Sequence, residues 1–253
     1  MAQLGYETIG EGPRRVMVLH GWFGDQTFLA PMKPALDGSA FTYVCPAYRG
    51  YGASRGIEGR YDMAEISGDV LELADNLGWE TFNLIGHSMG GMAVQRVLAD
   101  APGRIEKMVA LTPVPAAGVP LDADGEALFG GAAANMDNRR AIIDFTTGNR
   151  LTKIWVDRMA QYSAETARED AFAAYLTAWT KTDFHQEIAG NPVPLKVIVG
   201  ANDPALSAEV MQATYMQWYP NAELEVMPNA GHYPMDETPV ALVTSIEAFL
   251  RSD

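Results

Sequence analysis

One serine stands among three glycines in the stretch Asn83–Met92, which reads NLIGHSMGGM. The apolar residues before Gly86 predict a strand, and the sequence MAVQRVLADA, which begins at Met92, predicts a helix. Gly86, Ser88 and Gly90 therefore have the spacing and the context of a nucleophile elbow, a sharp turn that exposes a serine hydroxyl. Larger side chains at the two flanking glycines would collide with the neighbouring strand and helix. We interpret Ser88 as a nucleophile rather than as a simple turn or helix cap.

A serine hydroxyl needs a base to activate it and an acid to orient that base. The chain has four histidines, which are His20, His87, His185 and His232. In sheets that carry this elbow, the catalytic residues follow the order serine, acid, histidine along the chain. Only His232 leaves a late strand between itself and Ser88 for the acid, so we predict that His232 is the base.

The acid is expected just after the apolar run LKVIVG, where the sequence GANDPALS contains Asp203. That position is the carboxyl end of a predicted strand, where open α/β sheets bind ligands. Two rivals remain, because Asp183 precedes this strand and Asp236 follows the histidine. A plain turn aspartate in an Asn-Asp-Pro bend is the other interpretation of Asp203. We predict Asp203 as the acid.

The same chemistry needs backbone N–H groups that stabilise an oxyanion. The N–H of Met89, directly after the serine, is the first predicted donor. The sequence VMVLHGWFGD ends another predicted strand, and there Trp22 is the favoured second donor, with Phe23 as the alternative. The side chains of both aromatics are expected to pack at the floor of the pocket. His20, just before them, is expected to be structural.

The elements that position these residues alternate between short apolar runs and segments of helical period. This alternation is typical of a mostly parallel sheet covered by helices, and we predict an α/β fold. Strands that are nearly all apolar are buried on both faces. The predicted strands are Val16–Leu19, Phe41–Val44, Phe82–Ile85, Met108–Leu111, Leu195–Val199 and Leu224–Met227.

Two helices have clear signals. Asp62 and Glu65 have capping-box spacing, and the helix that follows is expected to run until Gly78. Pro239 marks the start of the last helix, whose apolar stripe should close the domain against the sheet. The stripe of the first helix is Met63, Ile66, Val70, Leu73 and Leu77, and that of the last is Leu242, Ile246, Phe249 and Leu250.

The alternation of strands and helices lapses between Val114 and Ile188, where alanine-rich and aromatic-rich helical stretches appear. A loop of that length without its own structure would be implausible in a compact domain. We predict a core domain of residues 1–113 and 190–253, with a helical cap of residues 114–189 inserted in it. Cap aromatics should roof an apolar pocket, although half of them or more are expected to be cap core. They are Phe145, Trp155, Tyr162, Phe172, Tyr175 and Trp179.

The composition excludes several classes of protein. Hydrophobic residues make up 48% and charged residues 20% of the 253 residues, as in soluble globular proteins. The formal net charge of −14 would repel the phosphates of nucleic acids and the surface of anionic membranes. We therefore expect a small-molecule substrate and neither a nucleic-acid nor a membrane partner, while the oligomeric state stays open.

The remaining signals are weak. Cys45 is the single cysteine, which excludes an internal disulfide and fits a reducing compartment. The N-terminal residues lack the basic and apolar regions of a signal peptide, so the expected location is cytoplasmic. The stretch RGYGASRG misses the spacing of nucleotide-binding loops, and no His-Glu-x-x-His cluster suggests a metal. No cofactor or metal is expected.

Taken together, the motifs resemble the α/β-hydrolase superfamily, in particular its capped serine esterase and haloperoxidase-like branch. The stretches LHGWFGD, YRGYGAS, LIGHSMGG, TDFHQEI, VIVGANDP and NAGHYPMDETP occur in the expected order over nearly the whole chain. The resemblance implies an α/β-hydrolase fold without a cofactor, with Ser88 as nucleophile, Asp203 as acid and His232 as base. The serine disfavours the haloalkane dehalogenase members, which use an aspartate there.

The sequence departs from the family pattern at two places. Ala47 follows Pro46 where the family commonly has an aspartate before the Arg-Gly turn, so a supporting interaction there is in question. The portion before Val16 has room for only one strand, which would reduce the usual leading hairpin. Neither departure touches the predicted triad.

The predicted function is hydrolysis of small carboxylic esters or lactones through an acyl-enzyme on Ser88. The same triad would serve a C–C bond or amide hydrolase, and the sequence does not separate these reactions. A ligand-binding or signalling protein that retains a hydrolase pocket is the alternative from a different class.

Overall fold

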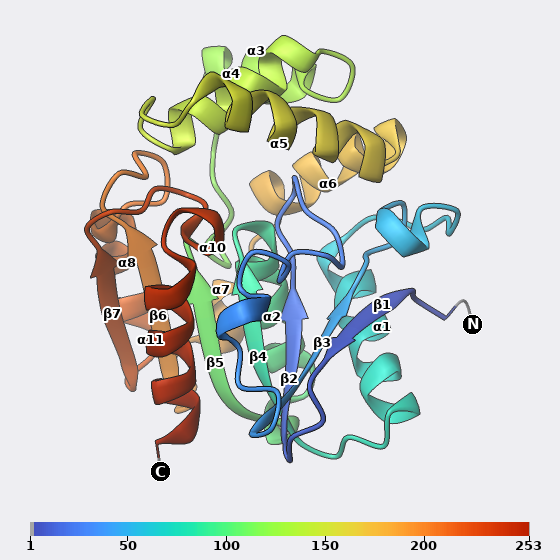
Figure 1. Cartoon of the computed structure of the whole chain (residues 1–253), viewed down its shortest axis with the longest axis vertical. Helices are drawn as coiled ribbons and strands as arrows, with labels where there is room; N and C mark the ends of the chain where they lie inside the picture. The colour runs from blue at the N-terminus through green and yellow to red at the C-terminus, as the bar shows by residue number, and fades with distance from the viewer. Residues whose placement is uncertain (1–2, 253) are drawn as a thin grey trace.

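The computed structural model describes residues 3–252, and its centre is a seven-stranded sheet in the order β1-β3-β2-β4-β5-β6-β7 (Figure 1). Every neighbouring pair is parallel except β1 and β3, which are antiparallel. The strands are β1 (Tyr6–Ile9), β2 (Arg14–Leu19), β3 (Phe41–Pro46), β4 (Phe82–His87), β5 (Ile105–Leu111), β6 (Leu195–Gly200) and β7 (Ala222–Met227).

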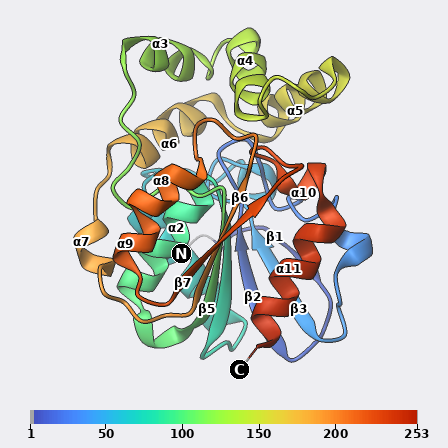
Figure 2. The same cartoon turned by 90° about the vertical axis from the view of Figure 1, so that its left-hand side faces the viewer.

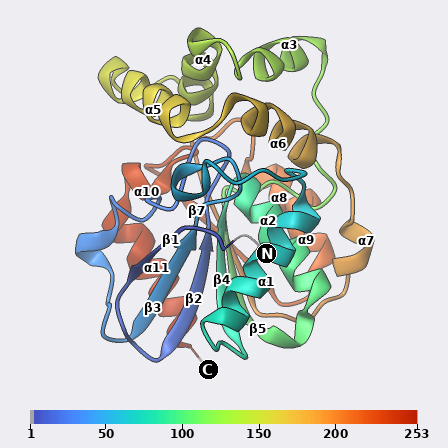
Figure 3. The same ribbon diagram turned by 90° about the vertical axis from the view of Figure 1, so that its right-hand side faces the viewer.

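Helices cover both faces of the sheet, as Figures 2 and 3 show, with α11 on one face and α1, α2, α8 and α9 on the other. The α-helices are α1 (Met63–Asn76), α2 (Met89–Asp100), α3 (Ala123–Gly131), α4 (Met136–Thr146), α5 (Lys153–Thr166), α6 (Glu169–Lys181), α7 (His185–Ile188), α8 (Ala208–Ala213), α9 (Tyr215–Trp218), α10 (Pro234–Glu237) and α11 (Pro239–Arg251). Short 3₁₀ helices span Lys33–Ala35, Gly52–Ser54 and Pro102–Arg104.

All six predicted strands are present, each within two or three residues of its expected bounds. The central residues of β2, β4 and β5 are fully buried because helices cover both faces of the sheet, whereas those of the edge strand β7 are half-buried or exposed. The single strand expected before Val16 is β1, which pairs antiparallel with β3 at the edge of the sheet. The leading hairpin is therefore reduced to one short strand.

The two helices with clear sequence signals are also present. Asp62 caps α1, since its carboxylate accepts the backbone N–H of Glu65 at 2.7 Å, and Gly78 follows the helix with a positive φ of 67°. The Glu65 carboxylate reaches back to the N–H groups of Arg60 and Tyr61 rather than to that of Asp62, so the reciprocal half of the capping box is shifted. In α11, the predicted stripe residues Leu242, Ile246 and Leu250 are buried.

A layer of four helices, α3 to α6, lies above the sheet at the end where β4, β5 and β6 finish (Figure 1). These helices all lie within the predicted cap of residues 114–189. The helix α7 also falls in that range, but it packs against α2 beside the sheet. The exact domain boundaries stay a prediction. No helix within residues 3–252 is long and apolar enough to cross a membrane.

The turn after β3 is supported in a different way from the family pattern. Ala47 is fully buried, and the nearby Arg49 guanidinium donates to both oxygens of Asp69 on α1, at 2.8 and 2.7 Å. A guanidinium fits a carboxylate in this bidentate manner. The arginine of this turn is therefore held by an aspartate of the first long helix.

Candidate active site

Ser88 lies at the junction of β4 and α2 in a strained backbone conformation, with φ 54° and ψ −118°. A Cβ atom at Gly86 would lie 2.3 Å from the carbonyl oxygen of Gly90, and one at Gly90 would lie 2.2 Å from that of Leu19. Both contacts are impossible, which confirms why the turn needs glycine at these positions. The Ser88 N–H donates to the carbonyl of Leu111 at 3.0 Å, so the neighbouring strand holds the strained residue in place.

His232 and Asp203 meet at the same end of the sheet, from the loops that follow β7 and β6. His232 Nδ1 lies 2.6 Å from Asp203 Oδ2, and both side chains are buried. The other carboxylate oxygen of Asp203 accepts the N–H groups of Ala205 and Leu206, at 2.9 and 3.1 Å. This carboxylate is thereby fixed as an acceptor, so His232 carries its proton on Nδ1 and leaves Nε2 free to act as a base.

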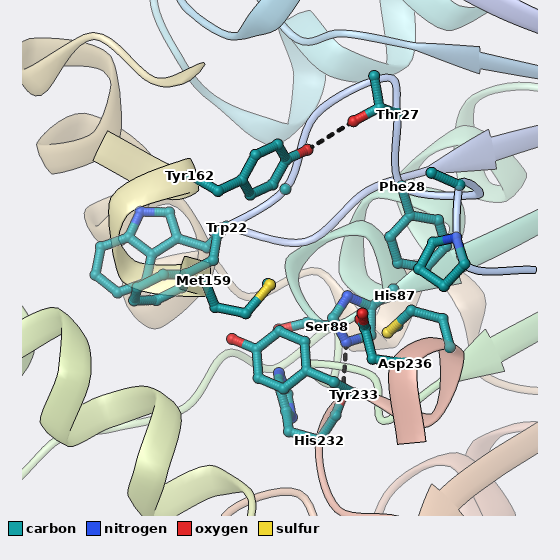
Figure 4. A pocket seen from close by; sticks show the side chains of 15 residues that line it. Trp22, Thr27, Phe28, His87, Ser88, Met159, Tyr162, His232, Tyr233 and Asp236 are labelled. Carbon is teal, nitrogen blue, oxygen red and sulfur yellow. Dashed lines mark hydrogen bonds between the residues drawn. The ribbon is translucent and has the colours of Figure 1, made fainter. Parts of the chain in front are cut away.

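Ser88 and His232 line the same two cavities, described below, and Figure 4 shows them side by side. No hydrogen bond joins the Ser88 hydroxyl to the His232 ring among residues 3–252. Such a bond is often long in a resting site and shortens when substrate binds. The arrangement is one in which a bound carbonyl group could contact both side chains.

The loop that carries His232 is held by hydrogen bonds to several elements. His87, inside the elbow, donates from Nε2 to the His232 carbonyl at 2.8 Å, and Thr112 donates to the same carbonyl at 3.1 Å. The Glu237 carboxylate accepts the N–H groups of Gly231 and Tyr233, on either side of the histidine. Burial lowers the pKa of His87, which keeps its ring neutral and able to donate. The sequence offered no signal for this role of His87.

The other residues considered for the triad lie elsewhere or have other partners. The His20 ring bonds to the carbonyl of Gly21 and the N–H of Tyr48, and burial lowers its pKa to about 4, so it is structural as expected. His185 pairs with Asp183 at 2.6 Å outside both cavities. Of the rival acids, Asp236 does reach the pocket, but it forms no ion pair with His232.

The predicted oxyanion donors lie on the two chain segments that meet at Ser88. Met89 is the first residue of α2, and Trp22 and Phe23 follow β2 in the lining of both cavities. The Trp22 indole N–H donates to the carbonyl of Phe172 at 2.8 Å, and the two rings stack with centroids 4.0 Å apart. The Trp22 side chain therefore joins the loop after β2 to α6, while a Cβ atom at the preceding Gly21 would lie 3.1 Å from Ser88 Cβ.

Two cavities meet at the serine, and we call them the acidic lobe and the apolar lobe. The acidic lobe has a volume of about 200 Å³ and is shown in Figure 4. It is lined by Trp22, Phe23, Gly24, Thr27, Phe28, Ala30, Pro31, His87, Ser88, Met159, Tyr162, His232, Tyr233, Met235 and Asp236. Thr27 of the loop after β2, His87 of β4, Tyr162 of α5 and Asp236 of α10 contribute polar side chains to it.

The apolar lobe has a volume of about 210 Å³ and lies on the other side of the shared residues. It is lined by Trp22, Phe23, Ser88, Val114, Val119, Leu121, Phe129, Ile142, Phe145, Thr146, Trp179, Ala205, Leu206, His232 and Tyr233. Apart from the shared residues, its polar groups are the Thr146 hydroxyl, which donates to carbonyls of its own helix, and the buried indole N–H of Trp179, which has no hydrogen-bond partner among the described residues. This lobe offers an apolar surface to a ligand.

The predicted cap aromatics divide evenly between the cavities and the packing of the cap. Tyr162 lines the acidic lobe, while Phe145 and Trp179 line the apolar lobe. Trp155, Phe172 and Tyr175 instead contact aromatic residues outside residues 114–189, so they pack the cap against the rest of the chain, whereas we expected them in the core of the cap itself. Sequence reasoning did not identify Met159 and Phe129, since a single apolar residue on a helix does not indicate which neighbour it faces.

Asp236 has a distinctive environment in the acidic lobe. Its half-buried carboxyl lies on α10, and burial raises its pKa to about 6, with the Trp155 indole opposing and Glu237 adding to the rise. No lysine, arginine or histidine pairs with it among the described residues. No group of three or more His, Cys, Asp and Glu side chains that could hold a metal ion occurs within residues 3–252.

A family model and several known sequences match the chain. A family model described as "alpha/beta hydrolase fold" matches residues 14–239. The chain is 27% identical over 97% of its length to a dihydrolipoyllysine-residue acetyltransferase component of the acetoin cleaving system from Pseudomonas putida, of which it spans 66%. It is 25% identical, over 91% of its length and 88% of the relative, to the non-heme chloroperoxidase CPO-A1 from Kitasatospora aureofaciens.

A lactonase is also among these relatives. The 3-oxoadipate enol-lactonase 2 of Acinetobacter baylyi is 25% identical over 98% of the chain and 93% of the relative. Among solved structures, a hydrolase from Oleispira antarctica superposes with a TM-score of 0.88 at 20% identity, over 99% of this chain and 96% of that one. An esterase from Exiguobacterium antarcticum superposes with a TM-score of 0.86 at 18% identity, over 98% and 95%. At these identities the structures support the fold.

Proposed function

Because the chain belongs to the α/β-hydrolase family and its relatives include esterases, lactonases and haloperoxidases, we propose that it is a serine hydrolase of small carboxylic esters or lactones. That it is a hydrolase follows from the family, whereas the substrate and the triad are the proposal. The observation that carries it is the 2.6 Å contact of the buried Asp203 with His232, which lines the same cavity as the strained Ser88.

In the proposed reaction, Ser88 Oγ attacks the carbonyl carbon while His232 Nε2 takes its proton. The N–H groups of Met89 and Trp22 stabilise the resulting oxyanion. The tetrahedral intermediate collapses, the leaving alkoxide takes the proton from His232, and an ester on Ser88 remains. Asp203 holds the imidazole in the useful tautomer and stabilises its cation.

Water completes the cycle. It transfers a proton to His232 and attacks the acyl group, and the second intermediate releases the carboxylic acid when Ser88 recovers its proton. In a lactone the alcohol and the acid are parts of one molecule, so one hydroxy acid is released. No cofactor is needed in any step.

The lining of the two lobes bears on which substrates fit, since some relatives of the chain are named for substrates that bear carboxylates. One relative is named for an adipate enol-lactone, and another is a Pseudomonas putida hydrolase named for dienedioate and trienedioate compounds, all of which bear carboxylates. A buried carboxylate needs a cationic partner, and no lysine or arginine lines either lobe. The lack of a lysine or arginine in the lining favours substrates without a carboxylate and disfavours C–C cleavage of dioates.

The test is hydrolysis of 4-nitrophenyl esters of rising acyl length by the wild type and by Ser88→Ala. The wild type should turn over short or medium esters, and the variant should lose turnover by several orders of magnitude with an unchanged fold. Ser39→Ala, which removes an exposed hydroxyl outside the pocket, is the matched control and should retain full activity. Equal activity of Ser88→Ala and wild type would refute the proposal.

A further inference from the structure

The acidic lobe contains a carboxyl group without a counter-ion inside the protein. Asp236 lines this lobe next to Met235 and Tyr233, and Figure 4 shows it close to His87 and Ser88. No cationic side chain among residues 3–252 pairs with it. A half-buried carboxylate that lacks a cation is unfavourable in the free protein, because it has lost part of its hydration. A cationic group of a ligand would supply the missing partner.

The surroundings of the lobe reinforce its negative potential. Asp25 lies behind the lobe, where its buried carboxylate accepts the Thr27 hydroxyl at 2.6 Å and the Tyr162 hydroxyl. Both donors are neutral, since burial and the nearby Asp25 hold the pKa of Tyr162 well above its usual range. The formal net charge of −14 would in addition attract cations to the site and repel anions.

The rest of the lining fits an alkylated cation better than a bare one. Aromatic rings of Trp22, Phe28 and Tyr233 and the thioethers of Met159 and Met235 line the lobe. Aromatic faces attract ammonium groups, and methylated ammonium ions are bound in proteins by such aromatic surroundings. An apolar wall with one carboxylate suits a group that is apolar on its outside and positively charged overall.

We propose that the acidic lobe binds an alkylammonium group of the substrate, paired with Asp236, so that the preferred esters carry a positive charge near the scissile bond. The expected preference in turnover rests on the proposed hydrolysis at Ser88. The expected binding of the cation does not depend on that proposal. The apolar lobe then receives the uncharged hydrocarbon part of the same substrate.

Binding is tested first, without catalysis. Choline, its neutral isostere 3,3-dimethylbutan-1-ol and the anion 3,3-dimethylbutanoate are titrated by calorimetry into Ser88→Ala. Choline should bind roughly tenfold more tightly than the neutral isostere, and the anion should bind most weakly. Adding Asp236→Asn should reduce the preference for choline to less than about threefold.

The control for long-range attraction is Asp124→Asn, which removes the same charge from an exposed site on α3. It should keep the full preference for choline. Equal or tighter binding of the neutral isostere to the Ser88→Ala protein would overturn the proposal even if the Asp236 variant did not fold. A preference that survives unchanged in Asp236→Asn would overturn the assignment to this residue.

Turnover is tested with two ester pairs, since the cation could lie in either half of the substrate. Butyrylcholine is compared with 3,3-dimethylbutyl butyrate, and the 4-nitrophenyl ester of 4-(trimethylammonio)butanoate with that of 5,5-dimethylhexanoate. In at least one pair, Asp236→Asn should lower the ratio of kcat/KM values, cation over neutral, by roughly tenfold. No change in either ratio, with 4-nitrophenyl butyrate still hydrolysed, would overturn this proposal alone. Choline binding without hydrolysis of any ester would overturn the proposed function alone.

Discussion

The acidic lobe and the apolar lobe share Ser88, His232, Trp22, Phe23 and Tyr233, yet their remaining walls come from different parts of the chain. The acidic lobe is built by the loop after β2, by α5 and by α10, whereas α3, α4, α6 and the segment after β5 build most of the apolar lobe. One reactive centre therefore serves two environments of opposite character. In the proposed function, the reaction would depend on the shared residues, and the selectivity for substrates would depend on the segments that build each lobe.

The largest effect is expected where the two lobes meet. Asp203→Asn should lower kcat by about 10³- to 10⁴-fold, because the imidazole loses both its useful tautomer and the charge that stabilises its cation. The loss should be the same for esters that fill either lobe, as measured by steady-state kinetics with short and long acyl chains. Asp183→Asn removes the carboxylate of the other aspartate–histidine pair, at His185, and should leave kcat unchanged. A loss confined to one class of ester would contradict a shared centre.

A smaller effect should follow from filling one lobe. Val119 lines the apolar lobe and is half-buried, so Val119→Phe can reduce its volume without forcing the core apart. Each buried methylene contributes about 0.8 kcal/mol, and we expect kcat/KM for long-chain esters to fall roughly tenfold or more while short esters are unaffected. Val240→Phe, at a position that is 67% exposed on α11, is the control. An equal fall for all chain lengths would show that the substitution disturbs the shared centre instead.

The smallest effect concerns stability and belongs to the acidic lobe. The folded pKa of Asp236, about 6, lies above the ordinary value of 3.8, so folding favours the protonated form. The cost to stability therefore grows as the pH rises from 3.8 to about 6, is complete above 6, and is absent below the unfolded pKa. Asp236→Asn removes the charge and should raise the free energy of unfolding relative to wild type by about 1 to 2 kcal/mol at pH 8, and by roughly half of that at pH 5.

Urea unfolding at the two pH values measures this difference. The groups that interact with Asp236 are Glu237, Trp155 and Tyr233, and they are the same in both proteins, so their own titration largely cancels. Asp124→Asn, on the exposed surface, should show no change in the difference between the two pH values. A difference between Asp236→Asn and wild type that does not depend on pH would contradict the raised pKa.

Much of the fold was predictable because its signals are local. The strands are short apolar runs. The elbow is recognisable from Gly86 and Gly90, because a larger side chain at either position would clash with the neighbouring backbone. The edge strand β1 carries a weaker signal, since its residues alternate between exposed and half-buried and form no apolar run. The cap was predictable as helical, but its helices do not reveal in sequence which side chains they turn toward the site.

The sequence by itself determined the order of strands and helices, the position of the serine turn and the choice of His232, because each depends on neighbours in the chain or on the order of residues along it. Only the tertiary structure decided that Asp203, and not Asp236, contacts His232, that His87 holds the His232 carbonyl, and that the pocket divides into an acidic and an apolar lobe. These contacts join residues 29 to 145 positions apart in the chain. No local sequence pattern encodes contacts between residues so far apart in the chain. These contacts depend on how the loops after β2, β6 and β7 and the cap helices converge over one end of the sheet.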